Sequence, residues 1–158
     1  MSRAHPKPAS HSAHGLRFAI IAARYNARYT DALLSSARDT LAKAGAVPNK
    51  IRVVRVPGAF EIPVVAAKLG ASRKFNALIA LGVILRGETA HADLIAQAIT
   101  NRLSEISVRH GIPVIHEVLL VANEAQAQVR CLDPKHNRGE EAAHTAIEMA
   151  RLLKTLKS

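Results

Sequence analysis

Four short hydrophobic runs divide the chain, and each is followed by a stretch in which hydrophobic residues recur at helical spacing. We predict that the runs are β-strands; they cover residues 16–23, 51–56, 77–85 and 113–121. The run from Ala77 to Leu85 has no polar side chain. We therefore expect this strand to be buried on both faces, as in a parallel sheet covered by helices.

The first two helices are delimited by capping and breaking residues. After the first strand, Thr30 or Asp31 can cap a helix that runs to about residue 43 and ends at Gly45. The second helix is predicted to start near Glu61. Pro63 fixes this start, because proline is tolerated only in the first turn of a helix.

Three more helices are predicted in the second half of the chain. Glu88 and Thr89 are expected to open the third, a short helix covers residues 124–130, and the last runs from Gly139 to about residue 156. The inward positions of the third helix are predicted to be Leu94, Ile95, Ala98, Ile99, Leu103 and Ile106, and those of the last helix Ala142, Ala143, Ala146, Ile147, Ala150 and Leu153.

The alternation of strands with helices predicts a three-layer α/β/α domain around a four-stranded parallel sheet with right-handed crossovers. A length of 158 residues fits one such domain. We assign it to residues 16–158. Residues 1–15, which are rich in Pro, Ser, Ala and His, are expected to form a mobile N-terminal arm.

The charge and the aromatic content of the chain indicate which class of ligand it binds. The net charge is +10, from 22 basic and 12 acidic residues, but the basic residues are scattered along the predicted helices. The chain has only five aromatic residues, and it has no nucleic-acid-binding motif. We therefore predict no nucleic-acid partner, and an anionic small-molecule substrate explains the basic balance better.

Other classes of site lack their sequence signals. Cys131 is the only cysteine, which excludes an internal disulfide and favours the cytoplasm. We predict no membrane partner, because no apolar run has the length of a membrane span, and no secretory signal precedes residue 16. Metal-ligand spacing and glycine-rich phosphate loops of the ATP or NAD type are also missing, so no metal is expected.

Polar and aromatic residues follow three of the predicted strands. The segments are 24–26 (Arg-Tyr-Asn), 58–61 (Gly-Ala-Phe-Glu) and 86–91 (Arg-Gly-Glu-Thr-Ala-His). The carboxyl ends of parallel strands lie on one edge of a sheet, where α/β proteins bind ligands. A helix N-terminus after Arg86 and Gly87 offers an anion site, and His91 titrates near neutrality. These residues predict a phosphorylated ligand, with His91 in proton transfer.

Each of these residues also has a purely structural interpretation. Tyr25 can be a half-buried packing residue, and Glu61 can simply favour the start of a helix. His91 can be an ordinary surface residue in a first turn. The convergence of an aromatic ring, an amide, a carboxylate, an imidazole and a helix N-terminus is the stronger signal.

Three segments resemble the 6,7-dimethyl-8-ribityllumazine synthase family. They are Ala23-Arg24-Tyr25-Asn26, residues 56–63 (Val-Pro-Gly-Ala-Phe-Glu-Ile-Pro) and residues 80–91. Asn123-Glu124, Gln126 and the segment from Asn137 to Ala150 continue the resemblance in the same order, so that it covers nearly all of residues 16–157. It implies a flavodoxin-like fold and a transferase of riboflavin biosynthesis.

The family joins 5-amino-6-(D-ribitylamino)uracil to 3,4-dihydroxy-2-butanone 4-phosphate, releasing phosphate and water, without metal or organic cofactor. By this resemblance Tyr25 stacks on the pyrimidine ring beside Asn26. The segment 58–61 contributes Gly58, Ala59, Phe60 and Glu61, of which Ala59 and Glu61 hold the ribityl chain. Val83, Ile84 and Leu85 line the ring pocket, and Arg86 also binds substrate. Glu88 and Thr89 receive the phosphate, and His91 shuttles protons.

In this family the site lies between subunits of a pentamer. Arg130 matches an arginine that a neighbour extends to the phosphate, and His116 falls where a neighbour offers a ring to the same pocket. The turn at residues 132–136 (Leu-Asp-Pro-Lys-His) departs from the Lys/Gly-rich turn of family members that form shells. We therefore expect a homo-oligomer, as a pentamer or decamer in preference to a sixty-subunit shell.

Two competing functions follow from the same sequence. One is a catalytically weak paralogue that binds lumazine or flavin as a carrier or sensor. Loss of His91 or Arg130 would favour it, but both are present. The other is a basic nucleic-acid-binding module, which would bind with a steep dependence on salt and without preference for ribityl ligands.

Overall fold

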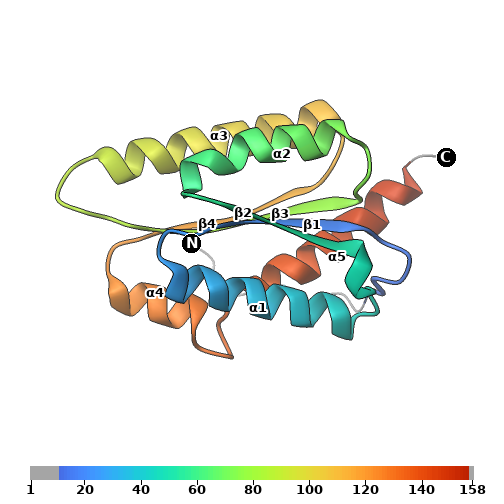
Figure 1. The fold of residues 1–158 in the computed structure, drawn as a ribbon, viewed down its shortest axis with the longest axis horizontal. Helices are drawn as coiled ribbons and strands as arrows, with labels where there is room; N and C mark the ends of the chain where they lie inside the picture. The colour runs from blue at the N-terminus through green and yellow to red at the C-terminus, as the bar shows by residue number, and fades with distance from the viewer. Residues whose placement is uncertain (1–10, 157–158) are drawn as a thin grey trace.

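The computed structural model describes residues 11–156, which form a single four-stranded sheet covered by helices on both faces (Figure 1). The strands are β1 (Phe18–Ala23), β2 (Ile51–Val56), β3 (Ala77–Leu85) and β4 (Val114–Val121). All pairings are parallel and the strand order is β2-β1-β3-β4. The predicted fold class is confirmed, since this order is that of the flavodoxin-like folds.

The helices form the two outer layers. Figure 1 shows α2 (Ile62–Ala71) and α3 (His91–His110) above the sheet, and α1 (Ala27–Lys43), α4 (Glu124–Cys131) and α5 (Arg138–Thr155) below it. Two short 3₁₀ turns, η1 (Pro48–Lys50) and η2 (Ala59–Glu61), connect to β2 and α2. None of the helices between residues 11 and 156 has the length and apolar character needed to cross a bilayer.

The core has two halves, because side chains of the central strands alternate between the faces. Ile79 and Leu81 of β3 pack with α1, α4 and α5, whereas Leu78 and Ala80 pack with α2 and α3. All four side chains are fully buried. This confirms the prediction that β3 is covered on both faces, and it leaves the strand ends as the part of the sheet that can meet a ligand.

The first helix starts earlier than predicted. It begins at Ala27, so the prediction that Thr30 or Asp31 caps it is wrong. Asn26 takes the N-cap position in the left-handed region (φ 54°), which asparagine tolerates better than most residues. Thr30 is fully buried, and its hydroxyl donates to the backbone oxygen of Tyr25.

The third helix starts later than predicted. It begins at His91, so Glu88 and Thr89 lie in a loop of residues 86–90 and do not form the first turn. Ile99, Leu103 and Ile106 are buried as predicted, but Leu94 is 65% exposed and Ala98 is exposed as well. The hydrophobic stripe on α3 therefore extends beyond the side chains that the rest of the same chain buries.

The segment before β1 packs onto the body of the domain. Ala13 is fully buried, and its backbone N–H donates to the backbone oxygen of Ala44. Arg151 of α5 donates from Nε to the backbone oxygen of Ser12 and from Nη2 to that of His14. Packed chain is thus present by Ser12, before the expected boundary at residue 16. Residues 1–10 of the expected mobile arm lie outside the described residues.

Candidate active site

The ends of β1, β2 and β3 meet on one edge of the sheet, as the strand order requires. The backbone N–H of Tyr25, after β1, donates to the backbone oxygen of Pro57, after β2, at 3.1 Å. On the other side of β1, Asn26 Nδ2 donates to the backbone oxygen of Val83 in β3 at 2.7 Å. The structure therefore brings the first two predicted segments together beside the end of β3, the strand that leads into the third segment.

Asn26 has a structural task that the sequence did not indicate. Its side-chain amide nitrogen ties the start of α1 to β3, and its own backbone stands in the left-handed region. The amide thereby fixes the direction of the chain immediately after Tyr25. Asn26 is half-buried, whereas Tyr25 projects from the same turn with 75% of its surface exposed.

The second segment forms a tight turn against β3. Glu61 folds back so that its Oε2 accepts the backbone N–H of Gly58 at 2.9 Å. A Cβ at Gly82 would lie 3.5 Å from the Cβ of Ala59 and 3.3 Å from Cγ1 of Val118. The missing side chain of Gly82 therefore lets η2 approach the sheet closely.

Two aromatic rings stand open to solvent on this edge. Tyr25 follows β1, and Phe60, which is 61% exposed, lies in η2 after β2. Most aromatic rings of this size are largely buried in a folded chain because exposing them to water costs free energy. Two exposed rings on neighbouring strand ends are thus candidates for contact with a flat ligand or with a second chain.

The third segment is an exposed loop closed by an ion pair. The backbone N–H of Arg86 donates to the backbone oxygen of Val121, which continues the pairing of β3 with β4. Arg86 Nη2 lies 2.6 Å from Asp93 Oδ1, so the two ends of the loop are joined. Asp93 was not predicted as a site residue. Its place in the first turn of α3 follows from the later start of the helix at His91, which the sequence did not indicate.

The start of α3 offers an anion site next to an imidazole. Residues 86–90 are all exposed, and an added Cβ at Gly87 would meet no atom within 4 Å. His91 is exposed, and its backbone N–H points to Thr89 Oγ1 at 3.4 Å. The free backbone N–H groups of a first turn carry a partial positive charge, which suits a phosphate.

Two predicted residues do not join this cluster within one chain. His116 pairs in register with Ala80, five residues before β4 ends, and its ring bonds to α3. Arg130 is exposed in the last turn of α4, in the helical layer opposite to the one that holds His91. Within one chain, Arg130 and His116 thus lie apart from the strand ends that lead into the Tyr25, Glu61 and His91 segments.

A buried acid that sequence analysis missed lies near the β4 edge. Glu117 is only 6% exposed, and Arg138 Nε and Nη2 lie 3.3 and 3.2 Å from its two carboxylate oxygens. Arg138 Nη1 also donates to Glu141 at 2.6 Å. Burial raises the pKa of Glu117 to about 7, although the guanidinium of Arg138 acts in the opposite direction. Desolvation of the carboxylate thus outweighs its ion pair.

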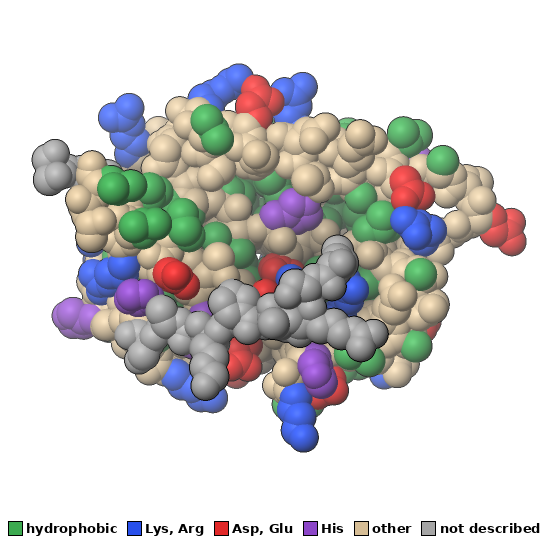
Figure 2. All heavy atoms as spheres, turned by 180° about the vertical axis from the view of Figure 1, so that it is seen from behind, with side chains coloured by type: hydrophobic (Ala, Val, Ile, Leu, Met, Phe, Trp, Pro, Cys, Tyr) green, Lys and Arg blue, Asp and Glu red, His purple; other side chains and the backbone are tan. Residues whose placement is uncertain are grey.

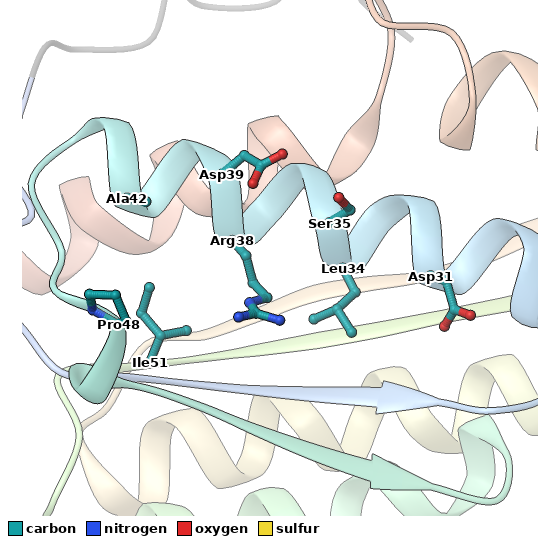
Figure 3. A pocket seen from close by; sticks show the side chains of 8 residues that line it. All are labelled: Asp31, Leu34, Ser35, Arg38, Asp39, Ala42, Pro48 and Ile51. Carbon is teal, nitrogen blue, oxygen red and sulfur yellow. The ribbon is translucent and has the colours of Figure 1, made fainter.

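The hollows of the single chain lie away from the predicted site. One of about 340 Å³ runs between α1 and the start of β2, where Leu34 and Arg38 point toward the strand (Figure 3). Another of about 670 Å³ separates α1 from the segment between α4 and α5. Neither is lined by a residue of the three strand-end segments. Within residues 11–156, no group of three or more His, Cys, Asp or Glu is placed to hold a metal ion.

Comparison with known proteins gives one consistent result. The family model described as 6,7-dimethyl-8-ribityllumazine synthase matches residues 15–154. A protein of that name from Desulfotalea psychrophila is 43% identical over 145 residues, covering 92% of this chain and 94% of its own. One from Thermococcus onnurineus is 44% identical over 142 residues (90% and 91%), and one from Stenotrophomonas maltophilia 42% over 140 residues (89% and 90%).

Proposed function

Because the chain belongs to the 6,7-dimethyl-8-ribityllumazine synthase family, we propose that it condenses 5-amino-6-(D-ribitylamino)uracil with 3,4-dihydroxy-2-butanone 4-phosphate. The products are 6,7-dimethyl-8-ribityllumazine, phosphate and water, and the step belongs to riboflavin biosynthesis. The observation that carries this conclusion is the family match across residues 15–154, which includes every strand-end segment of the candidate site.

The ring side of the proposed site is built from β1, η2 and β3. Tyr25 would stack on the pyrimidine, and the exposed ring of Phe60 would shield it. Val83, Ile84 and Leu85 would line the pocket at the end of β3, while Ala59 and Glu61 would hold the ribityl chain, with Gly58 in the same segment. In support, Ala59 and the end of β3 are brought close by the missing side chain of Gly82.

The phosphate side is built from the loop of residues 86–90 and the start of α3. The backbone N–H groups of Glu88 and Thr89 would bind the phosphate of the butanone, with Arg86 beside them. His91 would carry protons during formation of the imine and loss of phosphate, for which an imidazole that can both donate and accept a proton is suited. Much of the acceleration would come from holding the two substrates together, since no metal or organic cofactor is invoked.

We further propose that a neighbouring copy of the chain completes the site. Arg130 would reach the phosphate and His116 the pyrimidine, each from the partner, which fits their separation from His91 within one chain. Figure 2 shows hydrophobic side chains at the surface over the α2/α3 layer. On α3, Leu94 is 65% exposed and Val108 is 83% exposed. A second copy would cover them, as a pentamer or decamer in the cytoplasm.

The test is direct formation of product. Purified protein is mixed with both substrates and lumazine is followed by absorbance, with His91→Ala alongside. We expect product well above the spontaneous rate, and a kcat lower by about a hundredfold or more in the variant. Product at only the spontaneous rate with ribityl ligands still bound would refute the proposal and indicate the carrier or sensor.

A further inference from the structure

The ring of His116 is held by hydrogen bonds on both nitrogens. His116 lies in β4 on the side that faces α3, and its Nδ1 lies 3.2 Å from the backbone N–H of Val118, which donates to it. Its Nε2 lies 2.7 Å from Thr100 Oγ1 of α3. The Thr100 hydroxyl in turn donates to the backbone oxygen of Ala96 at 2.8 Å.

These contacts favour one form of the ring. A threonine hydroxyl has one hydrogen, and Thr100 gives it to Ala96, so Nε2 of His116 must carry a hydrogen and donate to Thr100. Nδ1 must then be unprotonated, because it accepts the N–H of Val118. Protonation of the ring would set two N–H groups against each other, so the network stabilises the neutral Nε2–H tautomer.

The charges around His116 do not oppose this state. On α3, Asp93 pairs with Arg86, and Glu105 pairs with Arg102 and Arg109. Glu117 follows in the strand but faces the other side of the sheet, where it meets Arg138. Burial lowers the pKa of His116, although a backbone hydrogen bond of His116 acts in the opposite direction.

We propose that Thr100 is a positioning residue, which holds His116 as a neutral, fixed ring for stacking on the pyrimidine bound by the neighbouring subunit. This inference rests on the proposed function of His116. A ring that is already oriented loses little freedom when the substrate arrives. A neutral ring also avoids the cost of removing a charge from water when the flat substrate covers it.

The first test is Thr100→Val, which keeps the shape of the side chain and removes the oxygen. We expect the KM for the ribitylaminouracil to rise about threefold to tenfold. The kcat at saturation and the KM for the butanone phosphate should change by less than about twofold. The KM should also rise further below about pH 7 in the variant alone, because the released ring can take a proton. Thr100→Ser keeps the hydroxyl and should restore the wild-type values.

A double-mutant cycle separates this role from a general effect on α3. His116→Phe keeps a flat ring without nitrogens, so Thr100 has nothing to hold. Thr100→Val should therefore add no further change of KM in the His116→Phe background. An equal loss in both backgrounds, or no loss in either, would overturn the proposal.

A readout without substrate completes the design. Nitrogen-15 NMR of the ring should show His116 as one neutral Nε2–H tautomer across about pH 5.5–8 in the wild-type protein and as a titrating ring in Thr100→Val. A wild-type ring that titrates freely near its ordinary value would overturn the inference whatever the kinetics. A wild-type protein with the fixed tautomer but no lumazine formation would instead refute the proposed function and, with it, the role in stacking.

Discussion

Glu117→Gln tests which effect on stability is larger for this buried carboxylate in β4: the cost of its desolvation or the gain from its ion pair with Arg138. Glutamine has nearly the same shape, stays neutral at every pH, and can still accept a hydrogen bond from Arg138. The carboxyl has a pKa of about 7 in the folded protein against an ordinary value of 4.5, because burial outweighs the guanidinium beside it. This difference corresponds to about 3 kcal/mol in the free energy of unfolding.

The direction in which stability changes with pH depends on whether the folded or the unfolded protein holds the proton on Glu117. Between pH 4.5 and about 7 the folded protein keeps a proton on Glu117 that the unfolded chain has lost. The stability of the wild-type protein should therefore fall as the pH rises through this window, and the contribution of Glu117 should stay constant above it. In Glu117→Gln this part of the pH dependence is absent. The two proteins should match near pH 4, and the variant should be more stable by about 3 kcal/mol near pH 8.

The assay is urea unfolding at the two pH values, at one fixed protein concentration because assembly shifts apparent stability. Glu148→Gln makes the same chemical change at an exposed position of α5 and should run parallel to the wild type. A Glu117→Gln protein that is less stable than the wild type near pH 8 would refute the reasoning. That result would mean that the pair with Arg138 outweighs the desolvation of the carboxylate.

Three other predictions follow from the structure. Arg130→Ala should raise the KM for the butanone phosphate about tenfold to a hundredfold in steady-state kinetics. The KM for the ribitylaminouracil should change by less than about twofold. Equal losses for both substrates would show that Arg130 does not bind the phosphate. A Cβ at Gly139 would lie 2.2 Å from the backbone oxygen of Leu33. Gly139→Ala should therefore lower Tm by about 4–8 °C, because α1 and α5 must separate to make room for the methyl group. Gly87→Ala is the control: its added Cβ meets no atom within 4 Å, so Tm should stay nearly unchanged. Equal shifts of Tm in the two variants would argue against the steric explanation. Leu94→Asp should yield smaller species in sedimentation velocity without loss of helical content, and an unchanged assembly would exclude this part of α3 from the interface.

The fold could be predicted because the hydrophobic pattern and the tertiary structure agree. An uninterrupted apolar run can be stable only where both faces are covered, and this predicted that β3 belongs to a parallel sheet with helices on both faces. The errors concern helix starts. Thr30 looks like a cap in the sequence, but the tertiary bond from Asn26 to Val83 starts α1 earlier. Such a bond between residues 57 positions apart leaves no local signal.

The site was predictable where it depends on strand ends, and not where it depends on side-chain partners. Parallel strands bring residues 24–26, 58–61 and 86–91 together whatever the details of packing. The bonds of His116 to Thr100 and of Glu117 to Arg138 join elements that only the folded chain brings into contact. Periodicity assigns each of these residues to a face of an element, but it does not say which polar group lies opposite.

The position of Glu117 on β4 also bears on how a newly made chain avoids wrong contacts with other molecules. β2 and β4 are the outer strands of the described sheet, and an outer strand exposes backbone groups that can pair with the strand of another molecule. If the chain assembles into the homo-oligomer proposed above, such pairing would compete with correct assembly. An inward-facing carboxylate on an outer strand discourages it, because a foreign strand would have to cover Glu117 without reproducing the contact from Arg138. The residue that costs stability at neutral pH would thereby protect newly made chains from aggregation.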